Sequence, residues 1–154
     1  IPATCDPNTR AMYTYWLVKC GERRMPSRKD IEPTEMLPQL LPGICIVDVV
    51  VDARRYVYRL VGTAVTEVRG QDPTGKSVVE ASFGSSAESL LKSYDQVVAT
   101  RAPLIDLRHY TNATGRYVTE ETVFLPLSDH GEKVDKILVF SQSRDLWLGA
   151  KRKA

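Results

Sequence analysis

The amino-acid sequence predicts a single α+β domain built on a five-stranded antiparallel sheet, with helices on one face. Two observations lead to this fold class. Apolar residues recur at helical spacing near residues 8–23 and 86–100, whereas β-branched runs bounded by turn residues fill residues 44–61 and 104–143. A chain of 154 residues is the usual size of one domain and can bury one hydrophobic core.

The N-terminal third is predicted to be a helical extension, residues 1–42. Residues 8–23 form a helix in which the apolar positions share one face. These positions are Met12, Tyr15, Trp16 and Cys20. Gly21 is the expected end of this helix. A short second helix is expected near residues 30–37, because Pro38 prevents it from continuing.

A strand hairpin opens the predicted core domain, residues 43–145. Residues 44–51 are apolar and mostly β-branched except at Asp48, so we expect this strand to be covered on both faces. A turn at residues 52–54 leads into a second strand at residues 56–61.

Helices are predicted between this hairpin and the later strands. Thr63 is the expected N-cap of a short helix that ends at Gly70. Residues 86–100 form a longer helix with one apolar stripe. The stripe consists of Leu90, Leu91, Tyr94, Val97 and Val98.

The last third is predicted to be strands again. Three strands are expected, at residues 104–110, 117–127 and 134–143. Turns containing Gly115 and Gly131 join them as hairpins. Residues 146–154 are expected to be a C-terminal tail, with the basic run Lys151 to Lys153 solvated.

Composition narrows the class of partner. The 21 basic and 19 acidic residues nearly balance, so we expect no nucleic-acid binding. We also expect no membrane span, because no apolar run approaches the ~20 residues that one requires. Cys5, Cys20 and Cys45 are widely spaced, which predicts neither a disulfide framework nor a metal site and suits a reducing cytoplasm.

The predicted order of elements, together with a series of short motifs, resembles the PAS domain family. Within it, the motifs are similar to those of a bacterial subfamily common in alphaproteobacteria. In chain order they are Trp16, GERRMPSR at 21–28, DIEP at 30–33, LP at 41–42, YRLVGT at 58–63, GQDPTG at 70–75, Pro103 and LPLS at 125–128. The resemblance implies a PAS-like fold and a sensory or protein-interaction role, often with dimerisation, but it does not imply a particular ligand.

The resemblance also allows two cofactors to be assessed. PAS domains that carry haem commonly ligate it through a histidine on the longer helix, and those with photoactive flavin resemble an Asn-Cys-Arg-Phe motif. Residues 86–100 contain no histidine and the chain contains no such motif, so we expect neither cofactor. His130 is expected to be a solvated turn residue, and His109 a satisfied core or edge histidine of its strand in preference to a metal or haem ligand.

We expect no enzymatic activity. The sequence contains no GxSxG, Walker-type GxxxxGK[ST] or HExxH motif. Glu120 and Glu121 are adjacent on a predicted strand, so they point to opposite faces and do not form a carboxylate pair.

Arg59 is the most informative candidate for ligand binding. It alternates with Val57 and Val61, which places a charge on an apolar strand face. One interpretation is a structural ion pair with Glu67 or Glu121. The other is that Arg59 grips a carboxylate or phosphate of a ligand. The full predicted ligand-binding set is Arg59, Tyr58, Tyr94, Arg108, Glu121 and Ser141.

The N-terminal helix is a candidate for dimerisation through Tyr15 and Trp16. Its apolar stripe must be covered either by the protein's own sheet or by a second subunit. The sequence therefore leaves two functions open. The first is a sensor that binds an unknown small molecule and signals to a separate protein. The second is a ligand-free interaction module.

Overall fold

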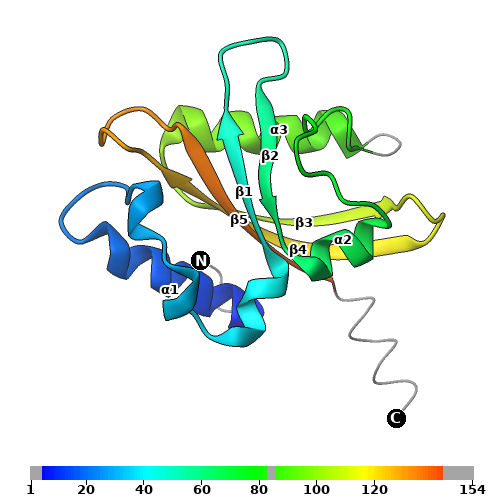
Figure 1. The fold of residues 1–154 in the computed structure, drawn as a ribbon, viewed down its shortest axis with the longest axis horizontal. Coiled ribbons are helices and arrows are strands. Elements are labelled where there is room, and N and C mark those ends of the chain that lie inside the picture. The colour runs from blue at the N-terminus through cyan, green and yellow to red at the C-terminus, as the bar shows by residue number, and fades with distance from the viewer. Residues whose placement is uncertain (1–4, 83–85, 144–154) are drawn as a thin grey trace.

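A five-stranded antiparallel sheet forms the centre of the computed structural model, which describes residues 5–82 and 86–143. The strands are β1 (Ile44–Val49), β2 (Tyr56–Val61), β3 (Leu104–Thr111), β4 (Tyr117–Leu127) and β5 (Lys136–Ser143). Their order across the sheet is β2-β1-β5-β4-β3, and every neighbouring pair is antiparallel (Figure 1). The predicted α+β fold class is confirmed.

Helices cover both faces of the sheet. Helices α2 (Thr63–Arg69) and α3 (Ser86–Thr100) lie on one face, which we call the α3 face, and α1 (Pro7–Cys20) lies on the other, the α1 face (Figure 1). Two residues of β4 show the division. The ring of Phe124 meets that of Tyr94 on α3, with centroids 5.1 Å apart. Glu121 accepts a hydrogen bond from the Thr9 hydroxyl of α1 at 2.8 Å.

Helix α1 begins at a side-chain cap and ends at a glycine. The Asp6 carboxylate accepts a hydrogen bond from the Asn8 backbone N–H at 2.8 Å, satisfying one unpaired donor of the first turn. Gly21 follows with a φ of 58°, a conformation that favours glycine. The helix therefore ends at Cys20 with Gly21 as its C-cap, as predicted, and does not continue to residue 23.

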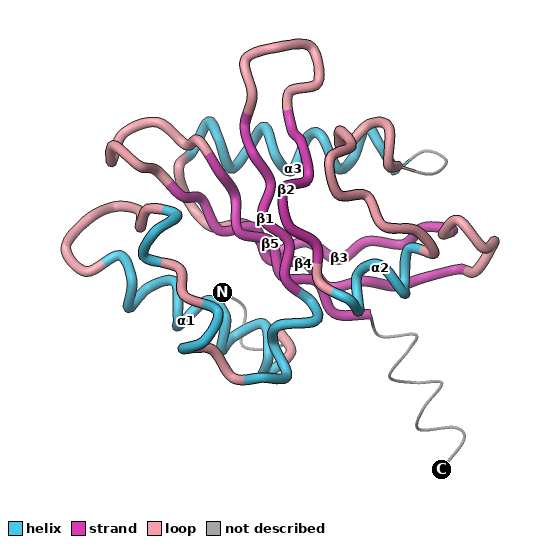
Figure 2. Tube along the Cα trace, viewed as in Figure 1, coloured by secondary structure: helices cyan, strands magenta, loops and turns pink. Residues whose placement is uncertain are grey.

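Three short 3-10 helices replace the single helix predicted for residues 30–37. They are η1 (Arg28–Asp30), η2 (Pro33–Glu35) and η3 (Pro38–Gly43), and Figure 2 shows them beside α1. Pro33 and Pro38 each start one of these turns, because a proline at the first helical position loses no hydrogen bond. The same residues prevent the turns from merging into one α-helix.

The start of α2 differs from its prediction. Gly62, not Thr63, occupies the N-cap position. A Cβ at residue 62 would lie 2.2 Å from the carbonyl oxygen of Pro42, so only glycine allows β2 to pass η3 this closely. The end of the helix is as predicted, since Gly70 is left-handed with a φ of 84°.

The core on the α3 face is largely aromatic. The Tyr94 ring stacks on Tyr56 with centroids 4.9 Å apart and meets Phe124 edge-on. Tyr58, Tyr94 and Phe124 are among the largest fully buried side chains. These rings occupy the space between α3 and the sheet. In the described residues, no helix is long and apolar enough to cross a membrane.

Candidate functional site

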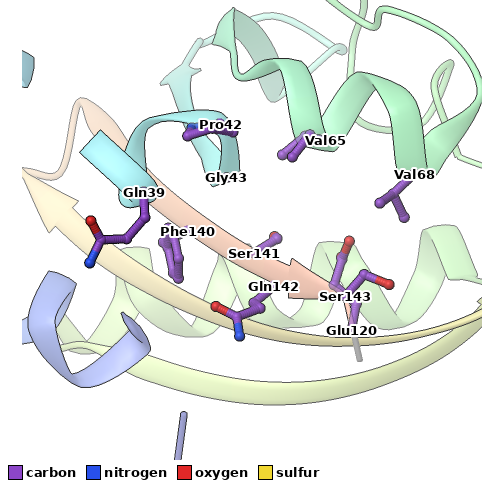
Figure 3. Close-up of a pocket in the computed structure, with 11 residues that line it drawn as sticks. Gln39, Pro42, Gly43, Val65, Val68, Glu120, Phe140, Ser141, Gln142 and Ser143 are labelled. Atoms are coloured by element: carbon purple, nitrogen blue, oxygen red, sulfur yellow. The ribbon is translucent and has the colours of Figure 1, made fainter. Parts of the chain in front are cut away.

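A pocket of about 330 Å³ lies between η3, α2 and the end of β5 (Figure 3). The pocket exists because β5 extends further than its neighbour β1 at this end of the sheet. The pairing of β1 with β5 begins at Ile44 and Phe140, whereas β5 continues to Ser143 alongside β4. Residues 141–143 therefore extend past β1 and form one wall.

The walls of the pocket are mixed in character. Val65 and Val68 point into it from α2, and Ser141 and Ser143 face them from β5 (Figure 3). The complete lining is Gln39, Pro42, Gly43, Ala64, Val65, Val68, Glu120, Phe140, Ser141, Gln142 and Ser143. Apolar surface with a few placed polar groups is typical of small-molecule sites.

Glu120 is the ionisable residue among those that line the pocket. It is buried, with 3% of its surface exposed. Its carboxylate accepts hydrogen bonds from the Tyr110 hydroxyl at 3.2 Å and from the Thr122 hydroxyl at 3.4 Å. Glu120 therefore gives the lining of the pocket a hydrogen-bond acceptor held in place by two neighbouring hydroxyls.

Glu120 is part of a buried polar cluster on the α3 face. The other members are Cys45, Tyr58, Arg69 and Tyr110. The Arg69 guanidinium lies 5.5 Å from the ring centroid of Tyr58 and 6.0 Å from that of Tyr110, within the range of cation–π contacts.

Burial controls the protonation of this cluster. It raises the pKa of the Cys45 thiol to about 12, and the positive charge of Arg69 opposes this only in part. Burial also raises the pKa of Tyr58 and of Tyr110. All three groups are therefore protonated at neutral pH.

Four of the six predicted ligand-binding residues lie on the α3 face. Ser141 lines the pocket, and its hydroxyl lies 3.2 Å from that of Thr122. Tyr58 and Tyr94 are buried between α3 and the sheet and do not line the pocket. Arg108 pairs with Asp106 at 2.9 Å, and Asp106 also accepts from Ser93 of α3 at 3.2 Å, so this network joins α3 to β3.

Glu121 lies on the opposite face. Its Oε2 atom accepts from the Asp6 backbone N–H at 3.0 Å and from the Thr9 hydroxyl at 2.8 Å. It holds α1 on the sheet and does not reach the pocket. The predicted opposite orientation of Glu120 and Glu121 is confirmed.

The prediction that Arg59 shares the inward face of β2 is wrong. Its side chain is 69% exposed and pairs with Asp48, with Nε 2.7 Å from Oδ2, and not with Glu67 or Glu121. The cause is a register shift. Ile46 pairs with Leu60 and Val47 with Tyr58, which leaves Arg59 as the extra residue of a β-bulge. Arg59 still shares a face with Val57, because its partner Asp48 is the cross-strand neighbour of Val57, but the shift puts Val61, the partner of Cys45, on the other face.

Of the candidate dimer residues, Trp16 is buried within the chain and Tyr15 is half-buried. Trp16 is 4% exposed, and its Nε1–H donates to the Pro126 carbonyl at 2.9 Å. The Tyr15 hydroxyl accepts from the Glu32 backbone N–H at 2.8 Å. The apolar stripe of α1 is therefore covered by the protein's own sheet, which is the first of the two predicted alternatives. Dimerisation stays a prediction, and the exposed apolar residues on α1 are Leu17 and Val18.

Sequence reasoning missed Arg69, Tyr110 and Glu120. Strand alternation from Phe124 could have placed Glu120 on the α3 face, because the two are four residues apart on one strand. Arg69 gave no such signal, since a basic residue in the last turn of a helix is ordinary.

The two histidines take ordinary positions. His109 stacks against Tyr117 with ring centroids 6.2 Å apart, and its Nδ1 lies 3.1 Å from the Thr119 hydroxyl. It is exposed, as is His130. Across the described ranges, no group of three or more His, Cys, Asp or Glu side chains could hold a metal ion.

Comparison with known proteins agrees with this architecture. A family model described as PAS domain matches residues 5–140, a range that includes α1 as well as the sheet. No curated protein matches the chain.

Solved structures share the fold at low sequence identity. The LOV domain of a blue-light activated histidine kinase from Erythrobacter litoralis superposes with a TM-score of 0.55 at 14% identity, covering 70% of this chain and 97% of that one. VqmA bound to DPO gives 0.54 at 18% identity, with 68% and 54% covered. The Drosophila melanogaster Cycle PAS-B domain with bound ethylene glycol gives 0.51 at 13%, with 65% and 97% covered.

Proposed function

The chain belongs to the PAS domain family, and on that premise we propose that it is a sensory domain with its ligand site between η3, α2 and the end of β5. PAS domains are sensory and signalling modules and are generally not catalytic. We infer the same for this chain. The observation that carries the proposal is a pocket with a buried carboxylate, Glu120, in its lining.

The lining indicates the kind of ligand. A volume of about 330 Å³ is at the small end of the range for ligand sites. Pro42, Val65 and Val68 offer apolar contact, and Glu120 offers an acceptor. An anion beside this carboxylate would be repelled. A small molecule with an apolar body and a hydrogen-bond donor suits the pocket better than the carboxylate or phosphate that the sequence suggested.

Gln142 provides a route from the pocket to α1. It borders the pocket on β5, and its amide group donates to the Asp6 carboxylate at 2.7 Å and accepts from Asn8 at 3.2 Å. If the end of β5 can take two positions and the ligand binds one of them more tightly, binding favours that position. The contact between Gln142 and Asp6, and with it the capping of α1, would then change. A separate signalling protein would read this change on the exposed side of α1, at Leu17 and Val18.

A ligand-free interaction module is the second candidate. This alternative is favoured by the aromatic packing on the α3 face, because side chains and not a ligand occupy the space between α3 and the sheet. Tyr58, Tyr94 and Phe124 are all buried there, and the rings of Tyr94 and Phe124 are in contact. On that alternative the pocket has no occupant, and the exposed face of α1 is the working surface.

The LOV neighbours raise the question of a flavin, since one of the similar structures is described as a LOV domain studied with a flavin analogue. The residues of this chain do not suit one. Aromatic rings fill the space between α3 and the sheet. The cysteine nearest that space is Cys45, which lies on β1 and whose raised pKa keeps it as a thiol. Our proposal therefore includes neither flavin nor haem.

Native mass spectrometry of freshly purified protein tests the proposal. We expect a retained small molecule, or a thermal shift with at least one neutral or cationic metabolite. Glu120→Gln should lose either signal. Glu121→Gln is the matched control, because it makes the same change at the next residue on the opposite face, and it should keep the signal. A protein without retained mass or thermal shift would support the interaction module instead.

A further inference from the structure

Two hydrogen-bond donors lie behind the pocket without an acceptor. Within residues 5–82 and 86–143, neither the Tyr58 hydroxyl nor the Arg69 Nε has a hydrogen-bond partner, and both atoms are buried. Tyr58 is 1% exposed. Burial raises the pKa of Tyr58, which the neighbouring Tyr94 opposes only slightly, and no hydrogen bond joins the two hydroxyls. Leaving a buried donor unpaired is costly, so such groups are uncommon without a functional reason.

The two donors are close to each other and to the pocket. The Arg69 guanidinium lies over the Tyr58 ring at 5.5 Å. Val68, the residue before Arg69, lines the pocket. On the other side, Arg69 neighbours the Tyr110 ring, whose hydroxyl donates to Glu120 of the pocket. Tyr110 and Glu120 therefore connect the donors to the lining of the pocket.

The fold holds this arrangement in place. Helix α2 ends at Arg69 because Gly70 takes a left-handed conformation. The end of the helix is tied to the β3–β4 turn, where Ala113 N–H donates to the Arg69 carbonyl at 3.0 Å. The Asn112 side-chain amide donates to the Val68 carbonyl nearby. Arg69 is thus positioned from two directions, as a built binding group requires.

We propose that Tyr58 and Arg69 form a subsite for the carbonyl oxygen of a neutral ligand whose donor group binds Glu120. This inference rests on the proposed function and specifies its ligand as amide-like, with a donor and an acceptor on one small molecule. The ligand's donor draws the Glu120 carboxylate away from Tyr110, and its oxygen then reaches the Tyr58 hydroxyl and Arg69 Nε–H.

Charge favours a carbonyl over a carboxylate. The positive charge of Arg69 is already opposed by the buried carboxylate of Glu120 in the same cluster. A second buried negative charge would outnumber the single positive charge of this cluster, which is far more costly than burying a neutral oxygen.

The Tyr58→Phe variant tests the hydrogen-bond donor and does not require the ligand to be identified. Removing an unpaired hydroxyl should raise the melting temperature of the ligand-free protein, yet abolish the retained mass seen by native mass spectrometry. Tyr56→Phe is the matched control, two residues away on the same strand. The Tyr56 hydroxyl is paired with Asp95, so its loss should lower the melting temperature and leave the retained mass. A lower melting temperature for ligand-free Tyr58→Phe would show that a water or a neighbour satisfies the hydroxyl and would overturn the subsite.

A titration with acetamide and with acetate, on the full chain, tests the ligand class. The readout is the Nε–Hε resonance of Arg69 in ¹H–¹⁵N NMR spectra. We expect acetamide to shift this resonance and acetate to leave it in place, with binding weakened about tenfold in Tyr58→Phe. An equal or larger effect of acetate would overturn the neutral class, and no effect of either probe would overturn the subsite. If a ligand binds and depends on Glu120 but not on Tyr58 or Arg69, this inference fails while the proposed function stands.

Discussion

Gln142 and Asp6 are 136 residues apart in sequence, yet the Gln142 amide donates to the Asp6 carboxylate at 2.7 Å. The bond joins the end of the last strand to the N-cap of the first helix. Since Gln142 also borders the pocket, a single side chain contacts both the candidate ligand site and the element that we expect to carry the signal.

Gln142→Ala should loosen the first turn of α1. The variant loses two hydrogen bonds to Asp6 and Asn8, which together contribute about 1–2 kcal/mol to the docking of that turn. Amide hydrogen exchange in residues 7–11 should accelerate, while exchange in β4 stays slow. Gln39→Ala is the control, because Gln39 is an exposed residue on the opposite wall of the pocket. Equal acceleration in both variants would argue against the Gln142 route.

Arg59→Ala should leave ligand retention unchanged and have only a modest effect on stability. Arg59 is 69% exposed but Asp48 only 13%, so the pair is half-buried and its loss should cost about 1 kcal/mol in the free energy of unfolding. Urea denaturation measures the first quantity and native mass spectrometry the second. Loss of the retained ligand in Arg59→Ala, with unchanged stability, would restore the original hypothesis that this arginine grips the ligand.

Arg59 also shows where sequence reasoning reaches its limit. The strands, the longer helix and their order follow from local patterns, because periodicity and turn residues act over a few positions. The direction of a side chain on a strand follows from alternation only while the register is unbroken. The bulge at Arg59 depends on how β1 pairs with β2, which no local pattern records.

The pocket was unpredictable for a related reason. It forms where η3, α2 and β5 meet, and these segments are distant in the chain. Ser141 was in the predicted set as a polar residue of the last strand. Arg69 was not, because its burial depends on contacts with Tyr58 and Tyr110 on two other strands.

Trp16→Ala should destabilise the domain strongly. The side chain is fully covered by the sheet and its Nε1–H is bonded to Pro126, so truncation leaves a large cavity and an unpaired carbonyl. The expected cost is about 3–5 kcal/mol in the free energy of unfolding, measured by urea denaturation. Val18→Ala is the control on the same helix, since Val18 is 71% exposed, and should cost no more than about 0.5 kcal/mol. A small effect of Trp16→Ala would mean that α1 is not docked as described.

Lowering the pH should destabilise the loop after α1, because protonation of Asp30 weakens the hydrogen bonds that its carboxylate accepts. The Ser27 backbone N–H bonds the Asp30 carboxylate at 2.8 Å, and this bond, with those from the Ser27 hydroxyl and Arg23, lowers its pKa from 3.8 to about 2. Because the folded-state pKa is depressed, the stabilisation is fully present above about pH 5 and is lost as the pH falls toward 2. Melting temperatures of the wild type should therefore fall more steeply over this range than those of Asp30→Asn.

Asp52→Asn provides the comparison for this pH effect. The pKa of Asp52 is also lowered to about 2, by Arg54, but the pair lies in an exposed turn where solvent screens it. We expect the pH profile of Asp52→Asn to follow the wild type more closely than that of Asp30→Asn does. If the two variants flatten the pH profile of the melting temperature equally, the hydrogen bonds between Asp30 and Ser27 add no more to stability than a surface ion pair does.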